Sequence, residues 1–190
     1  MIEKMKNSEN LSIRDQVIDY IKFLFIVAII VLPIRFYVAQ PFVVSGESMF
    51  PTFKDGQYII VDQISYNLGT PSRGDVAIFK FPQDTSKFFI KRVIGLPGET
   101  VEIKGQEVFI TPKDSVEKIK LNEPYIEMKR DVYETTTLKD DEYFVMGDNR
   151  LQSYDSRFWG PLNKKYLIGR AFLRLLPVDT LNYLPGIAKY

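Results

Sequence analysis

The chain of 190 residues contains no histidine and no cysteine. The absence of cysteine excludes disulfides and thiol nucleophiles, and without either residue a typical zinc site lacks its ligands. A serine hydroxyl is a weak nucleophile until a neighbouring base takes its proton, and the usual base is histidine. If this chain carries out acyl transfer, lysine is therefore the leading candidate for the base. We expect neither a metal nor another cofactor.

The chain also lacks a large excess of charge, since its net charge is +1 and its basic residues form no long block. Proteins that bind nucleic acid usually concentrate positive charge against the phosphate backbone, so nucleic acid is not expected as a partner. Hydrophobic residues make up 45% of the sequence and charged residues 26%. This composition supports a folded core, and the length predicts one main domain with a small addition.

One segment near the N-terminus is strongly apolar. Residues 23–34 carry no polar side chain, and apolar character resumes after Arg35. A helix over residues 21–38 would be roughly 27 Å long at about 1.5 Å per residue, close to the thickness of about 30 Å of a hydrocarbon core. The long side chains of Lys22 and Arg35 near its ends can reach the interface. We predict one transmembrane anchor over residues 21–39, with membrane lipid around it.

Two alternatives stay open for this segment. It could be a buried core helix, because the uninterrupted apolar run covers only twelve residues. It could also be a cleaved secretory signal, although bulky and polar residues, not a small-x-small site, follow the run directly. Orientation follows from flanking charge: residues 40–58 contain only Lys54, whereas four basic residues precede the segment, Lys4, Lys6, Arg14 and Lys22. The positive-inside rule therefore predicts a cytoplasmic segment at residues 1–20 and a main domain on the outer face.

After the apolar segment, short apolar runs alternate with turns rich in glycine and proline. Such a pattern predicts a mostly β fold. Residues 101–108 resemble a hairpin around Lys104-Gly105, whereas residues 111–140 are charged and poorly periodic and are interpreted as an inserted loop or small subdomain. The other candidate strands cover residues 57–61, 76–79, 88–94, 142–146 and 166–175.

Lys91 is the first candidate for chemistry. Alternate side chains of a strand share a face, so Lys91 is expected beside Phe89 and Val93, among apolar neighbours. Burial disfavours the charged ammonium and lowers its pKa from about 10.4. A neutral lysine can then act as a general base. The alternative is an edge-strand lysine that protects the sheet against aggregation.

Ser48 is the second candidate. It follows Gly46 and precedes Met49-Phe50-Pro51, so glycine allows close approach to a ligand and proline fixes the exit from the turn. Such a loop can present a hydroxyl and a backbone N–H together; the alternative is an ordinary turn serine. Residues 147–157 are dense in hydrogen-bonding groups that could form ion pairs, with Arg92 as a further partner, or could be a solvated loop.

Taken together, these segments resemble bacterial type I signal peptidases (leader peptidases) of the compact type with one N-terminal anchor. The resemblance extends from the anchor to about residue 175. It rests on four motifs in order: Ser48-Met49-Phe50-Pro51-Thr52, Arg73-Gly74-Asp75-Val76, Lys91-Arg92-Val93-Ile94-Gly95-Leu96-Pro97-Gly98-Glu99, and Gly147-Asp148-Asn149-Arg150 with Ser153, Asp155, Ser156 and Arg157.

The resemblance implies a β-rich catalytic core over residues 40–103 and 141–178, with a small inserted region at 104–140 and a C-terminal tail at 179–190. It implies a serine endopeptidase that cuts signal-peptide-bearing exported preproteins after a small-x-small sequence at the outer membrane face, close to the export machinery. Ser48 would be the nucleophile, its backbone N–H would bind the oxyanion, and Lys91 would be the general base.

Further roles follow from the same resemblance. Ser153 would orient Lys91, and Gly46 stands where some members have a serine whose hydroxyl helps bind the oxyanion. The architecture of the site would be held by Asp148, Arg150, Asp155 and Arg157, with Arg92 pairing with one of them.

Four residues flank the proposed pair and predict shallow apolar pockets for alanine-sized side chains: Val44, Met49, Phe89 and Ile90. Two other classes of protein remain alternatives to the peptidase. A self-cleaving repressor-type protease also uses serine and lysine but carries a DNA-binding or short soluble N-terminus. An anchored β-domain that binds peptides or assists surface assembly would need neither Ser48 nor Lys91.

Overall fold

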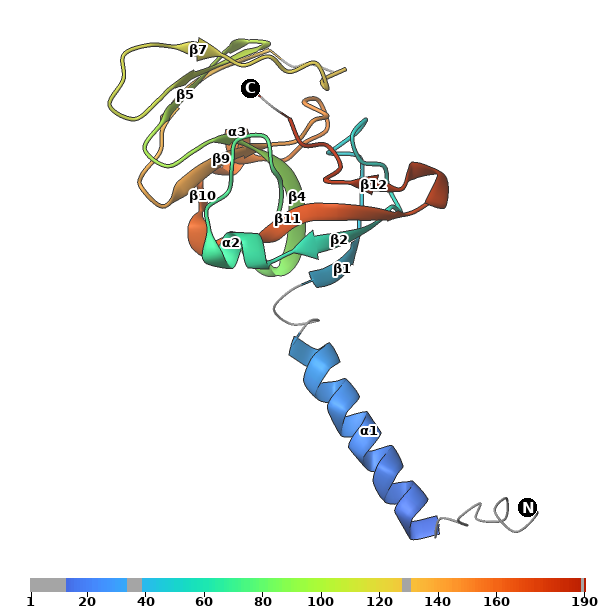
Figure 1. Cartoon of the computed structure of the whole chain (residues 1–190). Coiled ribbons are helices and arrows are strands. Elements are labelled where there is room, and N and C mark those ends of the chain that lie inside the picture. The colour runs from blue at the N-terminus through green and yellow to red at the C-terminus, as the bar shows by residue number, and fades with distance from the viewer. Residues whose placement is uncertain (1–12, 34–38, 128–130, 189) are drawn as a thin grey trace, which may run out of the picture. The chain divides into compact units, whose positions relative to one another are not determined.

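The computed structural model describes residues 13–33, 39–127, 131–188 and 190, and the chain divides into two compact units, Met1–Val38 and Ala39–Tyr190. Helix α1 (Ile13–Pro33) forms the first unit (Figure 1). It begins before the predicted residue 21, because the polar residues that precede the apolar run continue the helix, with Lys22 Nζ 3.0 Å from Asp19 Oδ1 one turn away. The predicted continuation over residues 34–38 lies outside the described residues.

A second observation concerns the predicted membrane anchor. None of the helices in the described residues meets the length and apolarity required to cross a membrane.

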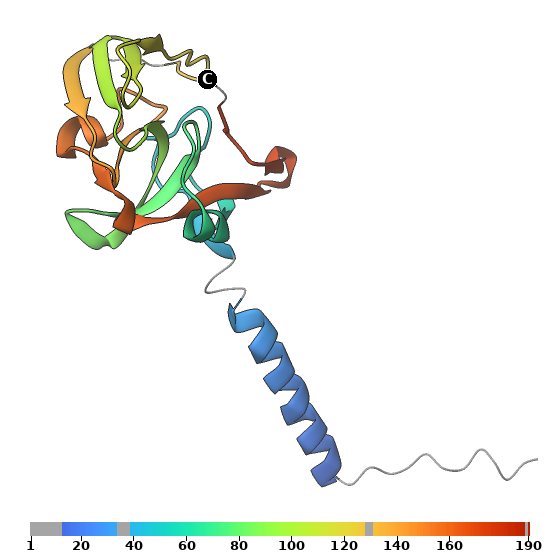
Figure 2. The same ribbon diagram turned by 60° about the vertical axis from the view of Figure 1, so that its left-hand side comes forward.

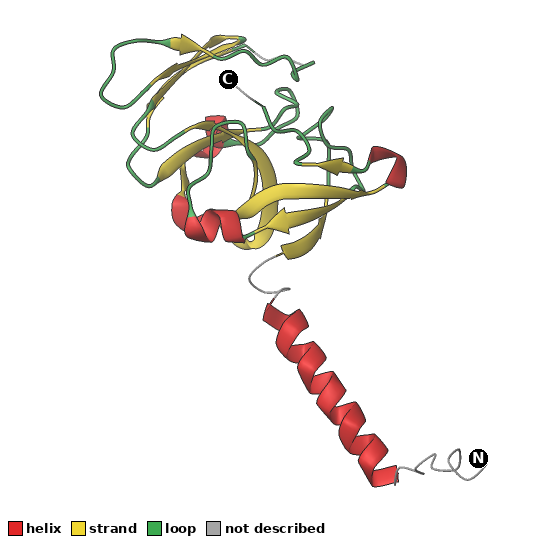
Figure 3. Ribbon diagram, in the orientation of Figure 1, coloured by secondary structure: helices red, strands yellow, loops and turns green. Residues whose placement is uncertain are grey.

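The second unit is built around an antiparallel sheet (Figure 3). Its described part contains eight strands in the order β1-β2-β11-β3-β4-β9-β10, with β12 paired to β11. The strands are β1 (Ala39–Val43), β2 (Tyr58–Asp62), β3 (Val76–Phe81), β4 (Asp84–Gly95), β9 (Glu142–Met146), β10 (Leu162–Asn163), β11 (Leu167–Leu176) and β12 (Asn182–Tyr183). The predicted strands at 57–61, 76–79, 88–94, 142–146 and 166–175 are confirmed as β2, β3, β4, β9 and β11.

A second, smaller sheet has the order β7-β6-β5-β8 and lies at one end of this unit (Figures 1 and 2). Its strands are β5 (Thr100–Gly105), β6 (Glu107–Thr111), β7 (Ile119–Lys120) and β8 (Val132–Thr137). The predicted hairpin is confirmed, since Lys104 pairs with Glu107 across its turn. Residue 104, the predicted start of the inserted region, falls inside β5. The poorly periodic segment also forms β8, which pairs with β5 along its length.

Both faces of the central strand β3 are buried. Val76 and Ile78 belong to one apolar cluster, and Ala77 and Phe79 belong to another. A third cluster joins Ile94 and Phe144 of the large sheet to the small sheet. Strand β4 therefore runs from an exposed start into the centre of the core, and Lys91 lies near that transition.

Short helices fill the connections: α2 (Ile64–Leu68), α3 (Ser156–Trp159), η2 (Lys164–Tyr166) and η3 (Val178–Thr180). The segment predicted as a C-terminal tail contains β12 and most of η3. Together with the end of β11, these elements project from the side of the unit (Figures 1 and 2).

Candidate active site

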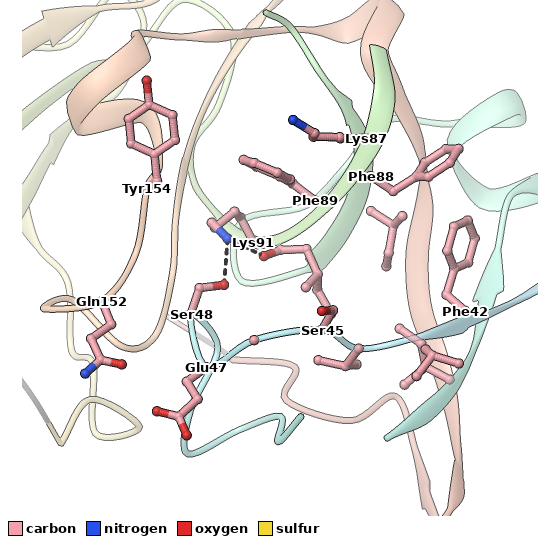
Figure 4. Close-up of a pocket in the computed structure, with 16 residues that line it drawn as sticks. Phe42, Ser45, Glu47, Ser48, Lys87, Phe88, Phe89, Lys91, Gln152 and Tyr154 are labelled. Atoms are coloured by element: carbon pink, nitrogen blue, oxygen red, sulfur yellow. Dashed lines mark hydrogen bonds between the residues drawn. The ribbon is translucent and has the colours of Figure 1, made fainter. Parts of the chain in front are cut away.

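Ser48 and Lys91 lie against one another, although 43 residues separate them in the sequence. Lys91 comes from β4, and Ser48 comes from the loop between β1 and β2. Lys91 Nζ lies 2.7 Å from Ser48 Oγ and donates to the carbonyl of Ile90 at 2.9 Å (Figure 4). The lysine is 4% exposed. The edge-strand alternative for Lys91 therefore does not describe its position.

The loop that carries Ser48 is held at both ends. Its start and end are joined by the hydrogen bond from Val44 N to Gln57 O at 2.9 Å. Gly46 has φ +85°, a conformation that glycine adopts without steric cost, and its N–H donates to Asp55 Oδ1 at 2.7 Å. Ser48 itself is fixed by its carbonyl, which accepts from Asn149 N at 3.1 Å.

Burial changes the protonation of Lys91. Loss of hydration lowers the pKa of Lys91 to about 8 from its ordinary 10.5, against the raising effect of the Asp155 and Asp148 carboxylates. Arg157 adds to the lowering. The predicted depression of the pKa is confirmed in direction, and a substantial fraction of the lysine is neutral near physiological pH.

Ser153 does not make the expected hydrogen bond to Lys91. Its hydroxyl is buried and has no hydrogen-bond partner among the described residues, because Lys91 Nζ turns to Ser48 and to the Ile90 carbonyl instead. Ser153 is nevertheless close to the pair: a Cβ added to Gly147 would lie 2.2 Å from Ser153 Oγ and 2.3 Å from the Ser48 carbonyl oxygen. Glycine at position 147 lets these two loops meet.

Two buried ion pairs involve residues adjacent in sequence to the site: Arg92, which follows Lys91, and residues of the 147–157 segment. Arg92 Nε donates to Asp148 Oδ1 at 2.8 Å, and its Nη2 donates to the other carboxylate oxygen. Arg157 binds Asp155 in the same bidentate way, with both contacts at 2.8 Å. Burial alone would raise the pKa of Asp155, but Arg157 lowers it, helped by the Ser153 hydroxyl, which lies nearby without reaching hydrogen-bond geometry. Arg92 thus pairs with Asp148, one of the partners expected for it.

Arg150 pairs outside the segment that contains it. Its Nη2 donates to Glu123, which lies in the loop after β7, and its Nε donates to the Gly147 carbonyl at 3.1 Å. Both members of this pair are almost fully buried. The region predicted as an insertion therefore contributes a carboxylate to the support of the site, and no local pattern around Glu123 indicated this.

A cavity of about 470 Å³ opens beside the Ser48–Lys91 pair. Val44, Phe89 and Ile90 line it, as predicted, but Met49 does not: its side chain is 1% exposed and packs in the core with Phe53. The turn that brings the Phe53 N–H to the Met49 carbonyl directs this side chain inward.

Sequence reasoning missed several residues that line the cavity. Figure 4 shows Phe42 and Phe88 on one side of the pair, and Gln152 and Tyr154 on the other. Gln152 and Tyr154 flank Ser153 in the sequence. The expected position of Ser153 beside Lys91 was therefore a signal that these two residues lie near the Ser48–Lys91 pair. Ile59 and Ile78 also line the cavity, and Glu47 and Lys87 add charged groups.

The arrangement can perform nucleophilic chemistry with a hydroxyl and an amine. The Ser48 backbone N–H has no hydrogen-bond partner among the described residues and can donate to a developing oxyanion. Gly46 offers no side-chain donor, and open space lies where its Cβ would be. Within the residues that the structure describes, no cluster of acidic side chains could hold a metal ion.

The chain matches one protein-family model and several known proteins. The family model described as "Signal peptidase, peptidase S26" matches residues 17–176. Signal peptidase I of Leptolyngbya laminosa is 38% identical over 179 residues, which cover 90% of this chain and 85% of that protein. Signal peptidase I P of Bacillus subtilis subsp. natto is 33% identical over 182 residues, covering 90% and 95%. A crystal structure of a signal peptidase I from Enterococcus faecalis V583 is 28% identical, with a TM-score of 0.37, and covers 53% of this chain and 95% of that one.

Proposed function

This chain belongs to the signal peptidase family, peptidase S26, and we propose that it is a membrane-anchored serine endopeptidase with a Ser-Lys dyad. It removes N-terminal signal peptides from exported preproteins after a small-x-small sequence. The observation that carries the proposal is the 2.7 Å contact between Lys91 Nζ and Ser48 Oγ in a chain without histidine or cysteine.

The reaction begins with neutral Lys91. As Ser48 Oγ attacks the scissile carbonyl carbon, its proton passes to Lys91 Nζ, and the carbonyl π electrons become an oxyanion. The carbonyl then re-forms, the C–N bond breaks, and lysinium donates its proton to the leaving amine. Lys91 Nζ then takes a proton from a water molecule as the water oxygen attacks the ester carbonyl. The bond between that carbon and Ser48 Oγ breaks, and lysinium returns the proton to Ser48 Oγ, which restores the enzyme.

The surrounding residues have supporting roles in this proposal. The Ser48 backbone N–H stabilises the oxyanion, a contribution of about 2.7–4 kcal/mol for one such donor in other enzymes. The arginines and aspartates of the two buried ion pairs hold the loops that carry Ser48 and Gly147. Ser153 is suited to orient Lys91 when the lysine exchanges its Ile90 contact during the reaction, because its buried hydroxyl has a free hydrogen-bonding capacity.

The cavity beside the pair supports a preference for small side chains. Val44, Phe89 and Ile90 bring bulky apolar groups to its wall, next to the nucleophile. Side chains of alanine size fit beside such walls, whereas larger ones must displace them.

The position at the membrane is also part of the proposal. Residues 21–39 anchor the chain, residues 1–20 lie in the cytoplasm, and the core at 40–103 and 141–178, with its insertion at 104–140 and tail at 179–190, lies on the outer face near the export machinery. The exposed apolar side chains of α1, such as Phe25 at 66%, support contact with lipid. The four basic residues before the apolar run support the orientation.

Cleavage in trans of a purified preprotein by the detergent-solubilised chain tests the proposal. Ser48→Ala and Lys91→Ala should each abolish cleavage after a small residue. Ser86→Ala and Lys80→Ala, exposed residues outside the cavity, serve as matched controls and should cleave normally. Full activity of Lys91→Ala would refute the base, and a folded chain that cuts nothing would favour an anchored peptide-binding module.

A further inference from the structure

Arg92 is held by more than its carboxylate partner. The residue is fully buried, at 0% exposure. Besides the two contacts to Asp148, Nη1 donates to the Gly74 carbonyl at 2.9 Å and to the Gly186 carbonyl. The ring of Tyr125 covers the guanidinium, with 4.0 Å between Arg92 Cζ and the ring centroid. Four of the five N–H groups of Arg92 therefore have partners among the described residues.

The Gly186 carbonyl belongs to what we call the closing segment, residues 184–188 together with Tyr190. This segment follows β12 and is attached where Leu184 N donates to Phe172 O at 2.7 Å. Its packing requires glycine on both sides: a Cβ on Gly74 would lie 2.1 Å from Ala188 O, and a Cβ on Gly186 would lie 2.3 Å from Thr52 Cγ2. The segment therefore packs closely against Gly74 and Thr52, with Pro185 buried and Ile187 exposed.

The tyrosine hydroxyls add a second attachment. Tyr190 and Tyr125 are joined through their hydroxyls, and Tyr125 also donates to Glu123 Oε1 at 2.7 Å. The closing segment thus contacts the same loop that covers Arg92 and pairs with Arg150.

Both proposed catalytic residues are linked to this arrangement, Lys91 by its peptide bond to Arg92 and Ser48 by a hydrogen bond. Lys91 directly precedes Arg92 in β4. On the other side, Asp148 accepts from Arg92 and from Thr52 Oγ1 at 2.5 Å, and the next residue, Asn149, donates its N–H to the Ser48 carbonyl at 3.1 Å. A displacement of the guanidinium would therefore move the supports of the base and of the nucleophile together.

We infer that the closing segment is a positioning element of the Ser48–Lys91 dyad, acting through Arg92. The inference rests on the proposed function and deepens it. The segment lies beyond residue 176, where the match to the family model ends. Without the Gly186 carbonyl, a buried guanidinium N–H loses its acceptor, and water gains access to the ion pair. A misplacement of about 1 Å in a catalytic pair can reduce the rate about a hundredfold.

The most specific test adds one methyl group to the closing segment and then removes the methyl group that it contacts. Gly186→Ala places a methyl against Thr52 Cγ2 at a residue with φ +76°, which alanine adopts only with strain, and should lower kcat tenfold or more. KM should change little, because the substrate cavity is untouched. Thr52→Ser removes Cγ2 but keeps the hydroxyl that binds Asp148, so the double variant should regain part of the lost kcat. Leu181→Ala, an exposed neighbour at 60%, is the control and should equal the wild type.

A variant that ends at residue 183 lacks the closing segment and provides a second test. It should lose kcat more strongly than KM, and the acid limb of its pH profile should move, because Asp148 acts on the pKa of Lys91. Melting curves identify variants that fail to fold. If Gly186→Ala, or the folded truncated chain, keeps kcat within twofold of the wild type, the inference is overturned. The proposed function fails separately, if wild-type cleavage persists in Ser48→Ala or Lys91→Ala.

Discussion

The rate of cleavage should follow the deprotonation of Lys91. Burial lowers the pKa of this lysine to about 8. At pH 8 about half of it is then neutral, whereas a lysine with its ordinary pKa of 10.5 would be only about 0.3% neutral. The site thereby increases the fraction of enzyme that can accept the Ser48 proton about 150-fold. Because the neutral amine is the active form, kcat/KM should rise with pH.

The assay is a pH profile of kcat/KM from about pH 5.5 to 9.5 at constant ionic strength, with a preprotein that has alanine one and three residues before the cut. Below about pH 7 the rate should increase nearly tenfold per pH unit, and above about pH 9 it should level off. Circular dichroism at each pH verifies that the chain stays folded. A flat profile between pH 6 and 9 would contradict Lys91 as the general base, because its deprotonation falls within this range.

Three further predictions concern the support and selectivity of the site. Asp148→Asn leaves Arg92 buried without its carboxylate, so the free energy of unfolding in urea should fall by about 3–5 kcal/mol; a change below about 1 kcal/mol would contradict the buried pair. Gly147→Ala places its Cβ 2.2 Å from Ser153 Oγ, so the folded variant should cleave at least tenfold more slowly, and normal rates would show that the loops can separate. Leucine in place of alanine one or three residues before the cut should slow cleavage by about tenfold or more, and Ile90→Ala should reduce this difference between the substrates. Equal rates for both substrates in the wild type would contradict the predicted shallow pockets.

The local pattern of the sequence was sufficient to predict the strands that carry the site. Apolar runs between glycine and proline turns correctly indicated β2, β3, β4, β9 and β11. The same reasoning predicted a depressed pKa for Lys91, because its burial follows from the apolar residues on its face of β4. Both conclusions depend on neighbours within a few residues, which periodicity can reveal.

Contacts between distant segments could not be predicted in this way. The pairing of Arg150 with Glu123 and the contact of Arg92 with Gly186, 94 residues apart, depend on how the connections fold back, which leaves no local signal. The position of Met49 directly after Ser48 predicts a pocket residue, but the turn directs its side chain into the core. The hydrogen bond expected for Ser153 is absent because Lys91 uses a backbone carbonyl of its own strand.

The identity of the acylated residue is the sharpest test of Ser48 as the nucleophile. The enzyme is mixed with a preprotein, quenched with acid during turnover, digested, and analysed by mass spectrometry for a peptide that carries the signal-peptide fragment as an ester. We expect this adduct on Ser48, and we expect Ser48→Ala to lack both the adduct and cleavage. An adduct on another residue, or cleavage that continues undiminished in Ser48→Ala, would contradict Ser48 as the nucleophile.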